Sequence, residues 1–330
     1  MGNSCAGAGG ADGAGDVDQV PAIIGGALAL AVGACLGSFA VTAAYRLPRD
    51  ISLITPGSFC ESCQRPVPWW ANVPIFAYLA LRGRCLMCGA PIAARHLGAE
   101  LLLALVALYL YVSFPLADAV ARLVFVTALV ICSLVDYDWR LIPNLVTFAG
   151  VPVGFAFAWL AMPEVGWRGS LIGIALGGGF LYVTGFVYQL VRHQEGVGLG
   201  DVFLLAMIGA FIGWPGVLFT LFFGALLGSL GGLAVGLFGT PRDAPEPPPA
   251  AREFARAPQT AAASGADVRS AAAEPAAAEA AAASAELQAA DTERSVSLLM
   301  TAVPFGPFLS IAAGVYAVFQ PVLTTWYFSR

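Results

Sequence analysis

Residues 117 to 138 read ADAVARLVFVTALVICSLVDYD, an apolar run that ends in two acids, Asp136 and Asp138. A helix needs about 20 apolar residues to cross a bilayer, and the run from Ala117 to Val135 comes close to that length. Arg122 lies near its start, from where its side chain is expected to reach the interface. Acidic groups at membrane depth are costly and usually functional. The stretch predicts a membrane helix that places a carboxylate at one membrane face.

The rest of the chain has the composition of a membrane protein. Of its 330 residues, 58% are hydrophobic and 11% are charged, whereas soluble proteins carry about 25% charged residues. Seven further apolar runs predict spans: 21–43, 98–114, 144–162, 170–191, 202–214, 216–238 and 298–320. The run 202–214 is short, so its helix is expected to begin in the preceding loop. We predict an all-α polytopic membrane protein of about eight transmembrane helices, with membrane lipid around it and no basic patch for nucleic acid.

The arginines predict the orientation of these spans. Six of them lie between the first two spans, and Arg140 and Arg192 lie in later loops on the same side. Cytoplasmic loops carry the excess of basic residues in membrane proteins. We therefore expect these loops to be cytoplasmic and both termini to be outside. No positive charge precedes the first apolar run, so a retained span is expected there rather than a cleaved signal peptide.

Between the first two spans lies a segment with two pairs of cysteines, Cys60-x2-Cys63 and Cys85-x2-Cys88. Four thiolates in two such pairs satisfy tetrahedral zinc, and a closed four-thiolate site is structural because it leaves no position for water. Disulfides are the weaker interpretation in the reducing cytoplasm. We expect a small cytoplasmic zinc-ribbon-like insert that holds structural Zn²⁺.

A second acid, Asp201, follows the glycine-rich loop 196–200. Two complete spans separate it from Asp136, so both acids reach the same, cytoplasmic, face. Two nearby carboxylates share a proton, which allows one to activate water while the other polarises a carbonyl. Gly198 and Gly200 allow close backbone packing around the acid. The pair predicts a metal-free hydrolytic site.

Plainer interpretations exist for each of these residues. Asp201 alone is an ordinary helix N-cap, and Asp138 is an ordinary interfacial acid. His96 and His193 have no partner ligand nearby in the sequence, and Glu100 has no clear role. A transporter with ion-binding acids would more often show internal repeats and broken helices at the midplane. A catalytically silent assembly protein is the other alternative, although both acids are present.

The chain divides into six segments. They are a polar N-terminal tail (1–20), the first transmembrane helix (21–43), the four-cysteine module (44–97), a membrane core of helices two to seven (98–238), an Ala- and Pro-rich linker (239–297), and the last helix with the C-terminus (298–330). The composition of the linker cannot bury a core, so a disordered cytoplasmic segment is expected there.

An ordered set of short motifs resembles the prepilin peptidases, the type IV leader peptidases of the GxGD aspartyl protease group. The motifs are Gly37-Ser38-Phe39, Tyr45-Arg46-Leu47-Pro48, residues 69–74, residues 81–85, Arg95, Glu100, Asp136 to Pro143, Gly198-Leu199-Gly200-Asp201 and Pro304-Phe305-Gly306-Pro307. Asn144, Phe203 and Val41 depart from the family pattern, which puts substrate contacts and methylation in question.

The resemblance implies an activity, a place and a substrate. Asp136 and Asp201 would be the catalytic pair, with Gly198 and Gly200 in the active-site loop. The enzyme would lie in the bacterial inner membrane and cut prepilins or pseudopilins at its cytoplasmic face. Long members of the family also methylate the new N-terminus with S-adenosylmethionine. The resemblance links that step to the cysteine module and identifies no cofactor-binding residues.

Overall fold

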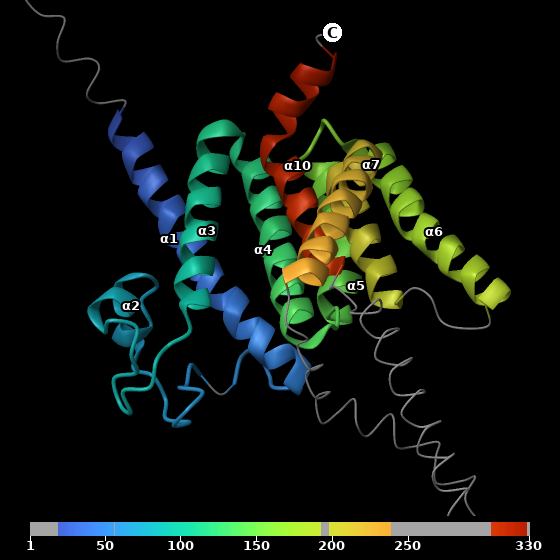
Figure 1. The fold of residues 1–330 in the computed structure, drawn as a ribbon. Coiled ribbons are helices and arrows are strands. Elements are labelled where there is room, and N and C mark those ends of the chain that lie inside the picture. The colour runs from blue at the N-terminus through green and yellow to red at the C-terminus, as the bar shows by residue number, and fades with distance from the viewer. Residues whose placement is uncertain (1–18, 56, 193–197, 239–304, 329–330) are drawn as a thin grey trace, which may run out of the picture.

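The computed structural model describes residues 19–55, 57–192, 198–238 and 305–328. This part of the chain is helical, and its β-structure is limited to two isolated antiparallel bridges. The α-helices are α1 (Gln19–Arg46), α2 (Phe76–Ala80), α3 (Ala94–Ser113), α4 (Leu116–Trp139), α5 (Asn144–Leu160), α6 (Gly166–Arg192), α7 (Leu199–Phe238) and α10 (Phe305–Phe328). Figure 1 shows the long helices side by side, with α2 and its flanking loops beside one end of α1 and α3.

Six of the described helices are long and apolar enough to cross a membrane, and α5 is a shorter apolar helix. The predicted spans 202–214 and 216–238 form one element, α7, which is interrupted at Gly213. That residue has φ 68° and ψ −177°, a conformation open essentially to glycine alone. Both ends of α7 lie on the same side of the molecule (Figure 1). The element therefore supplies two legs, and the expectation of about eight membrane helices is confirmed.

The helix ends differ from the predicted ones by a few residues. Helix α1 runs to Arg46, three residues beyond the predicted end, and α7 begins at Leu199, before the predicted start at Val202. The described part of the last helix begins at Phe305. The predicted tail up to residue 18, His193 and the predicted linker lie outside the described residues.

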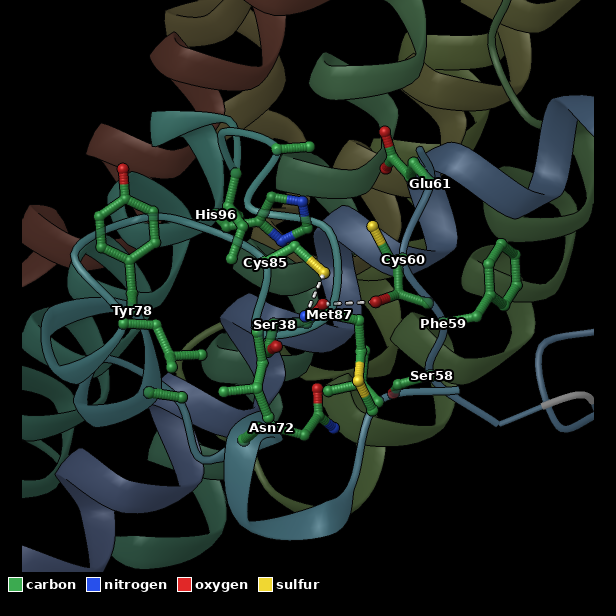
Figure 2. Close-up of a pocket in the computed structure, with 18 of the residues that line it drawn as sticks. Ser38, Ser58, Phe59, Cys60, Glu61, Asn72, Tyr78, Cys85, Met87 and His96 are labelled. Carbon is green, nitrogen blue, oxygen red and sulfur yellow. Dashed lines mark hydrogen bonds between the residues drawn. The ribbon is translucent and has the colours of Figure 1, made fainter. Parts of the chain in front are cut away.

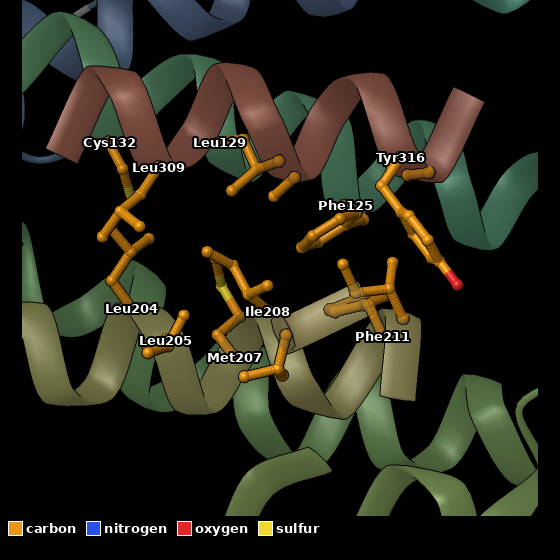
Figure 3. Close-up of a cluster of buried hydrophobic side chains, with 14 residues drawn as sticks. Phe125, Leu129, Cys132, Leu204, Leu205, Met207, Ile208, Phe211, Leu309 and Tyr316 are labelled. Atoms are coloured by element: carbon orange, nitrogen blue, oxygen red, sulfur yellow. The ribbon is translucent and has the colours of Figure 1, made fainter. Parts of the chain in front are cut away.

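The central core forms where α4, both legs of α7 and α10 meet (Figure 3). Phe125 of α4 stacks on Phe211 of α7 with 4.7 Å between the ring centroids. At the other end of the same core, Cys132, Leu204 and Leu309 form a buried layer from the three helices. One turn beyond each of these residues the chain reaches Asp136, Asp201 and Gly306, so the core brings those three positions to one end of the bundle.

Arg122 lies at the opposite end of α4 and is buried, with 1% of its surface exposed. Its Nε donates to Asp118 Oδ1 at 2.8 Å, and its Nη1 donates to the carbonyl oxygen of Ala317 on α10 at 2.5 Å. The Phe114 ring covers the guanidinium at 4.1 Å. Its Nη2 also lies 3.8 Å from Oε2 of the exposed Glu164. The side chain is thus held inside the protein by Asp118 and α10 while it points to an exposed acid, and its reach to the membrane interface stays a prediction.

We predict that Arg122→Met destabilises the folded protein in detergent by roughly 3–5 kcal/mol, because it leaves the Asp118 carboxylate buried without its cation. Adding Asp118→Leu should recover part of the loss, since no buried charge then remains. Thermal unfolding of both variants measures this. A double variant less stable than Arg122→Met would contradict the pairing.

Candidate active site and cysteine cluster

Asp136 lies in the last turn of α4 and is buried, with 6% of its surface exposed. Its Oδ2 accepts a hydrogen bond from the backbone N–H of Gly306 at 3.0 Å. The helix ends just after it, because Arg140 takes a left-handed conformation (φ 53°) and its N–H donates to the Asp136 carbonyl at 2.8 Å. The acid therefore sits at a helix end that is fixed by backbone geometry.

Asp201 lies in the first turn of α7 and is half-buried. Its N–H donates to the Gly198 carbonyl at 3.1 Å, which closes the turn that enters the helix. Gly200 packs against Ile142, and a β-carbon added there would lie 2.9 Å from the Ile142 Cβ. The small residue thus lets the start of α7 approach the segment that follows Asp136. The first residues of the glycine-rich loop, up to Val197, lie outside the described residues.

The two acids come from different helices and meet at the same end of the core. They lie near enough for the charge of Asp201 to act on Asp136. A pair of carboxylates in such a setting shares one proton, which leaves one group as a base and the other as an acid. The arrangement suits the addition of water to a carbonyl group.

Asp138 is separate from this pair. Its Oδ2 accepts a hydrogen bond from Arg95 Nη1 at 2.6 Å, and both side chains are partly exposed. Arg95 lies in the first turn of α3, at the C-terminal end of the cysteine module. The ion pair therefore ties the module to the end of α4, which agrees with an interfacial role for Asp138.

The four predicted cysteines gather in one cluster. Their sulfur atoms all lie within 4.8 Å of one another, and the Sγ atoms of Cys60 and Cys88 are 3.9 Å apart. Four sulfurs at about 2.3 Å from a tetrahedral zinc would be about 3.8 Å apart. The donor set and its spacing fit a metal such as zinc. Cys35 on α1 and Cys132 on α4 lie apart from this cluster.

The two cysteine pairs form the same turn twice. Cys60 and Cys85 each accept a hydrogen bond from the N–H four residues later, which belongs to Gln64 at 2.8 Å and to Gly89 at 2.9 Å. Both of these later residues have positive φ, 57° and 71°. Each turn is closed by an antiparallel bridge, Phe59 with Pro66 and Arg84 with Pro91. The repetition lets each turn direct two sulfurs at one point.

The backbone around Cys85 favours its thiolate. The N–H groups of Cys88 and Met87 lower the pKa of the Cys85 thiol to about 6, and the Met87 N–H donates to its sulfur at 3.4 Å. Metal ions bind the thiolate form of cysteine. The turn thus favours the thiolate at Cys85, whereas burial and the neighbouring cysteines raise the pKa of the Cys88 thiol to about 11.

Behind the cysteine cluster is a cavity of about 210 Å³ between the module and the membrane helices α1 and α3. Figure 2 shows Cys60, Cys85, His96 and Glu61 close together, with Ser38 and Asn72 on another part of the wall. Tyr45, Phe59 and Tyr78 add aromatic surface, and Glu100 and Arg46 add charge. The lining therefore combines aromatic, acidic and basic groups.

Two residues without a predicted structural role hold the module in place. Glu100 of α3 is buried and accepts a hydrogen bond from the N–H of Ile75 at 2.7 Å. Arg46 ends α1 and donates to the carbonyls of Ser52 at 3.0 Å and Gly57 at 2.8 Å. The partners of both side chains lie in loops several residues or more away in the sequence. The charge of Glu100 and Arg46 is visible in the sequence, but the partner of each is not.

Comparisons with known proteins identify the family of the chain. The chain matches the bacterial peptidase A24 N-terminal domain over residues 31–114 and the type IV leader peptidase family over residues 123–233. No solved structure matches it.

Three relatives share the name prepilin leader peptidase/N-methyltransferase. The protein of Myxococcus xanthus (strain DK1622) is 35% identical over 65% of this chain and 64% of its own length. That of Bacillus subtilis (strain 168) is 34% identical over 63% of this chain and 82% of its own length. That of Klebsiella pneumoniae is 32% identical over 59% of this chain and 88% of its own length. The two matched domains together cover the cysteine module and both acids, so the chain belongs to the type IV leader peptidase family.

Proposed function

We propose that this protein cuts the leader peptide of type IV prepilins or pseudopilins with Asp136 and Asp201, at the cytoplasmic face of the bacterial inner membrane. The observation that carries the proposal is that two acids from separate membrane helices lie at the same end of the core, with Asp136 buried and Asp201 half-buried. Family membership and the names of the relatives support the substrate class. They also favour a peptidase over a transporter or a silent assembly protein.

The proposed reaction uses water and the proton that the pair shares. The ionised carboxylate takes a proton from water, and the resulting hydroxide adds to the scissile carbonyl carbon. The protonated carboxyl group donates its proton to the carbonyl oxygen, so a neutral tetrahedral intermediate forms. The intermediate collapses when the leaving nitrogen receives a proton and the C–N bond breaks.

The site at the membrane face determines how a substrate must approach. The apolar helix of a prepilin would lie in the bilayer beside the enzyme, with its basic leader in the cytoplasm. A helix hides its carbonyl groups in backbone hydrogen bonds. The scissile segment must therefore unwind where it meets the two acids, at the boundary where water is available to its backbone.

We expect Asp136→Asn and Asp201→Asn each to lower the rate of leader cleavage by about 10²- to 10⁴-fold, because each removes one member of the acid–base pair. Asp136→Asn keeps an oxygen that can accept from Gly306, so this variant should fold. The measurement is cleavage of a prepilin from the same source in membranes, with the new N-terminus read by mass spectrometry.

Asp138→Asn is the matched control, since its carboxylate is engaged by Arg95 and lies outside the pair. It should keep most of the cleavage rate. Cleavage at the normal rate by either variant of the pair would refute the mechanism.

We also propose that the cysteine cluster holds one structural zinc ion. The four sulfurs would satisfy the metal, and the ion would join the two turns of a module that has little apolar core of its own. Zinc would then act on the shape of the module and would take no part in peptide hydrolysis.

The zinc proposal predicts about one zinc ion per purified chain, and Cys60→Ser combined with Cys85→Ser should abolish its binding because each turn loses a ligand. Elemental analysis by mass spectrometry measures the ratio. Cys35→Ser, which changes an exposed cysteine on α1, should leave the ratio unchanged. A metal-free wild-type protein after purification without chelators would count against the site.

A second reaction, N-methylation of the new N-terminus, is supported by the names of the relatives. S-adenosylmethionine supplies an electrophilic methyl group in such reactions. It carries an adenine ring, cationic groups and a carboxylate. The cavity behind the cysteine cluster fits such a ligand, since Tyr45 and Phe59 offer aromatic surface while Glu61 and Arg46 offer charges of both signs. We place the cofactor there.

Glu61→Gln should weaken binding of S-adenosylhomocysteine by about tenfold, because the exposed acid on the cavity wall loses its charge. Isothermal titration of the detergent-solubilised protein measures the affinity directly. Asp50→Asn removes the same charge from a nearby exposed position that does not line the cavity, so it should bind normally. Equal affinity in wild type and Glu61→Gln would place the cofactor elsewhere.

A further inference from the structure

Helix α10 lies outside both matched family domains, which end at residue 233, yet it contacts the proposed active site. The backbone N–H of Gly306, in the first turn of α10, donates to Oδ2 of Asp136 at 3.0 Å. The bond is buried and joins residues 170 positions apart. The first N–H groups of a helix have no partner within it. Gly306 therefore offers a free donor, and the next residue, Pro307, has no N–H to satisfy.

A side chain at position 306 would collide with Asp136. A β-carbon on residue 306 would lie 2.5 Å from Asp136 Oδ2 and 3.1 Å from its Cγ. Real Cβ atoms do not approach other atoms this closely, so a side chain would displace the carboxyl group or the helix. The carboxyl group of Asp136 thus rests on the bare backbone of α10.

The start of α10 is itself held from the other side by the second leg of α7. Phe305 packs over Gly228, Phe308 over Gly231 and Leu309 over Gly224, so three glycines form a surface that receives three side chains. Helices α4 and α7 contact each other much less than each contacts α10. The first leg of α7 carries Asp201. Helix α10, like α5, therefore connects the supports of both acids.

We propose that Gly306 is a positioning residue for the peptidase reaction, whose N–H holds Oδ2 of Asp136 so that Oδ1 is left for water and for Asp201. This inference rests on the proposed role of the two acids. Because Oδ2 of Asp136 accepts the N–H of Gly306, this oxygen carries no proton. The proton that the two acids share is then bound and released at Oδ1 of Asp136. The helix start also places its positive end at a carboxylate, which favours negative charge there.

A simpler interpretation is that Asp136 only caps α10. A cap stabilises the helix, and its loss would lower stability without a specific effect on turnover. Removal of the Gly306 N–H distinguishes the two interpretations. A positioning role predicts a lower kcat and a changed pH profile of cleavage, because the acid pair is altered. A cap predicts lower stability with kcat and the pH profile unchanged.

The test uses the full-length protein made by cell-free synthesis in lipid nanodiscs. Glycolic acid replaces Gly306, which exchanges the backbone N–H for an ester oxygen and adds no atoms. We expect kcat for leader cleavage to fall about 10- to 100-fold, as for other groups that hold a catalytic side chain. KM should stay within about twofold, and the pH profile should change shape, since substrate contacts are untouched while the acid pair is altered.

Gly306→Ala is the second variant, and it should lose more activity than the ester because it displaces Asp136. Gly314→Ala on the same helix is its control, since a β-carbon there meets only Leu129 Cδ1, at the ordinary distance of 4.0 Å. Thermal unfolding of each variant reports stability separately from kcat.

A normal kcat and pH profile in the ester variant would overturn the positioning role, including when its stability is reduced. Asp136→Asn separates this result from failure of the proposed function. If Asp136→Asn is inactive and the ester variant is normal, only the role of Gly306 is wrong. If Asp136→Asn still cuts, the acid pair itself is wrong.

Discussion

A carboxylate buried at the end of an apolar helix bundle needs a donor, and the structure is organised around meeting this need for Asp136. Among the residues that the structure describes, its oxygen forms no ion pair of the kind that Arg122 provides for Asp118 at the other end of α4. It finds a backbone N–H instead. A backbone donor adds no second charge to the site and cannot rotate away. It does require that a whole helix start within hydrogen-bonding distance, and the packing of α10 against α7 fulfils that requirement.

The break at Gly213 makes this packing possible. A straight 40-residue helix would be about 60 Å long, roughly twice the thickness of the apolar membrane core. Because the chain bends where only glycine fits, its first leg delivers Asp201 and its second leg delivers the glycine surface that receives α10. Helix α7 thus carries Asp201 itself and also holds α10, whose Gly306 binds Asp136. The cysteine module is joined to the same end of the bundle through Arg95, Glu100 and Arg46, each by a polar contact to a loop or helix end.

Features with a local signal could be predicted from the sequence, and features that depend on distant contacts could not. Apolar length gives the spans, the CxxC pairs give the sulfur cluster, and the number of spans between two acids gives their shared face. The pairing of Arg122 with a carbonyl on α10 has no local signal, and neither has the bond from Gly306 to Asp136. The sequence predicts that the helix of Asp201 begins before residue 202, but it does not identify Leu199 as the first residue. Glycines at a helix end leave its first residue undetermined, because they adopt many backbone conformations.

The spacing between the two acids therefore depends on α10 as well as on α4 and α7. Because Leu309 of α10 packs with Cys132 of α4 and Leu204 of α7, a shift of α10 would move Asp136 relative to Asp201 and disturb the core layer below them. The hydrogen bond to Gly306 opposes such a shift, because it couples the carboxylate to the helix that would have to move. In the proposed reaction, a substrate helix that unwinds beside the site needs room at this same end. The glycines that line the contact between α7 and α10 keep the two backbones close, and so they preserve the geometry of the pair while the substrate is accommodated.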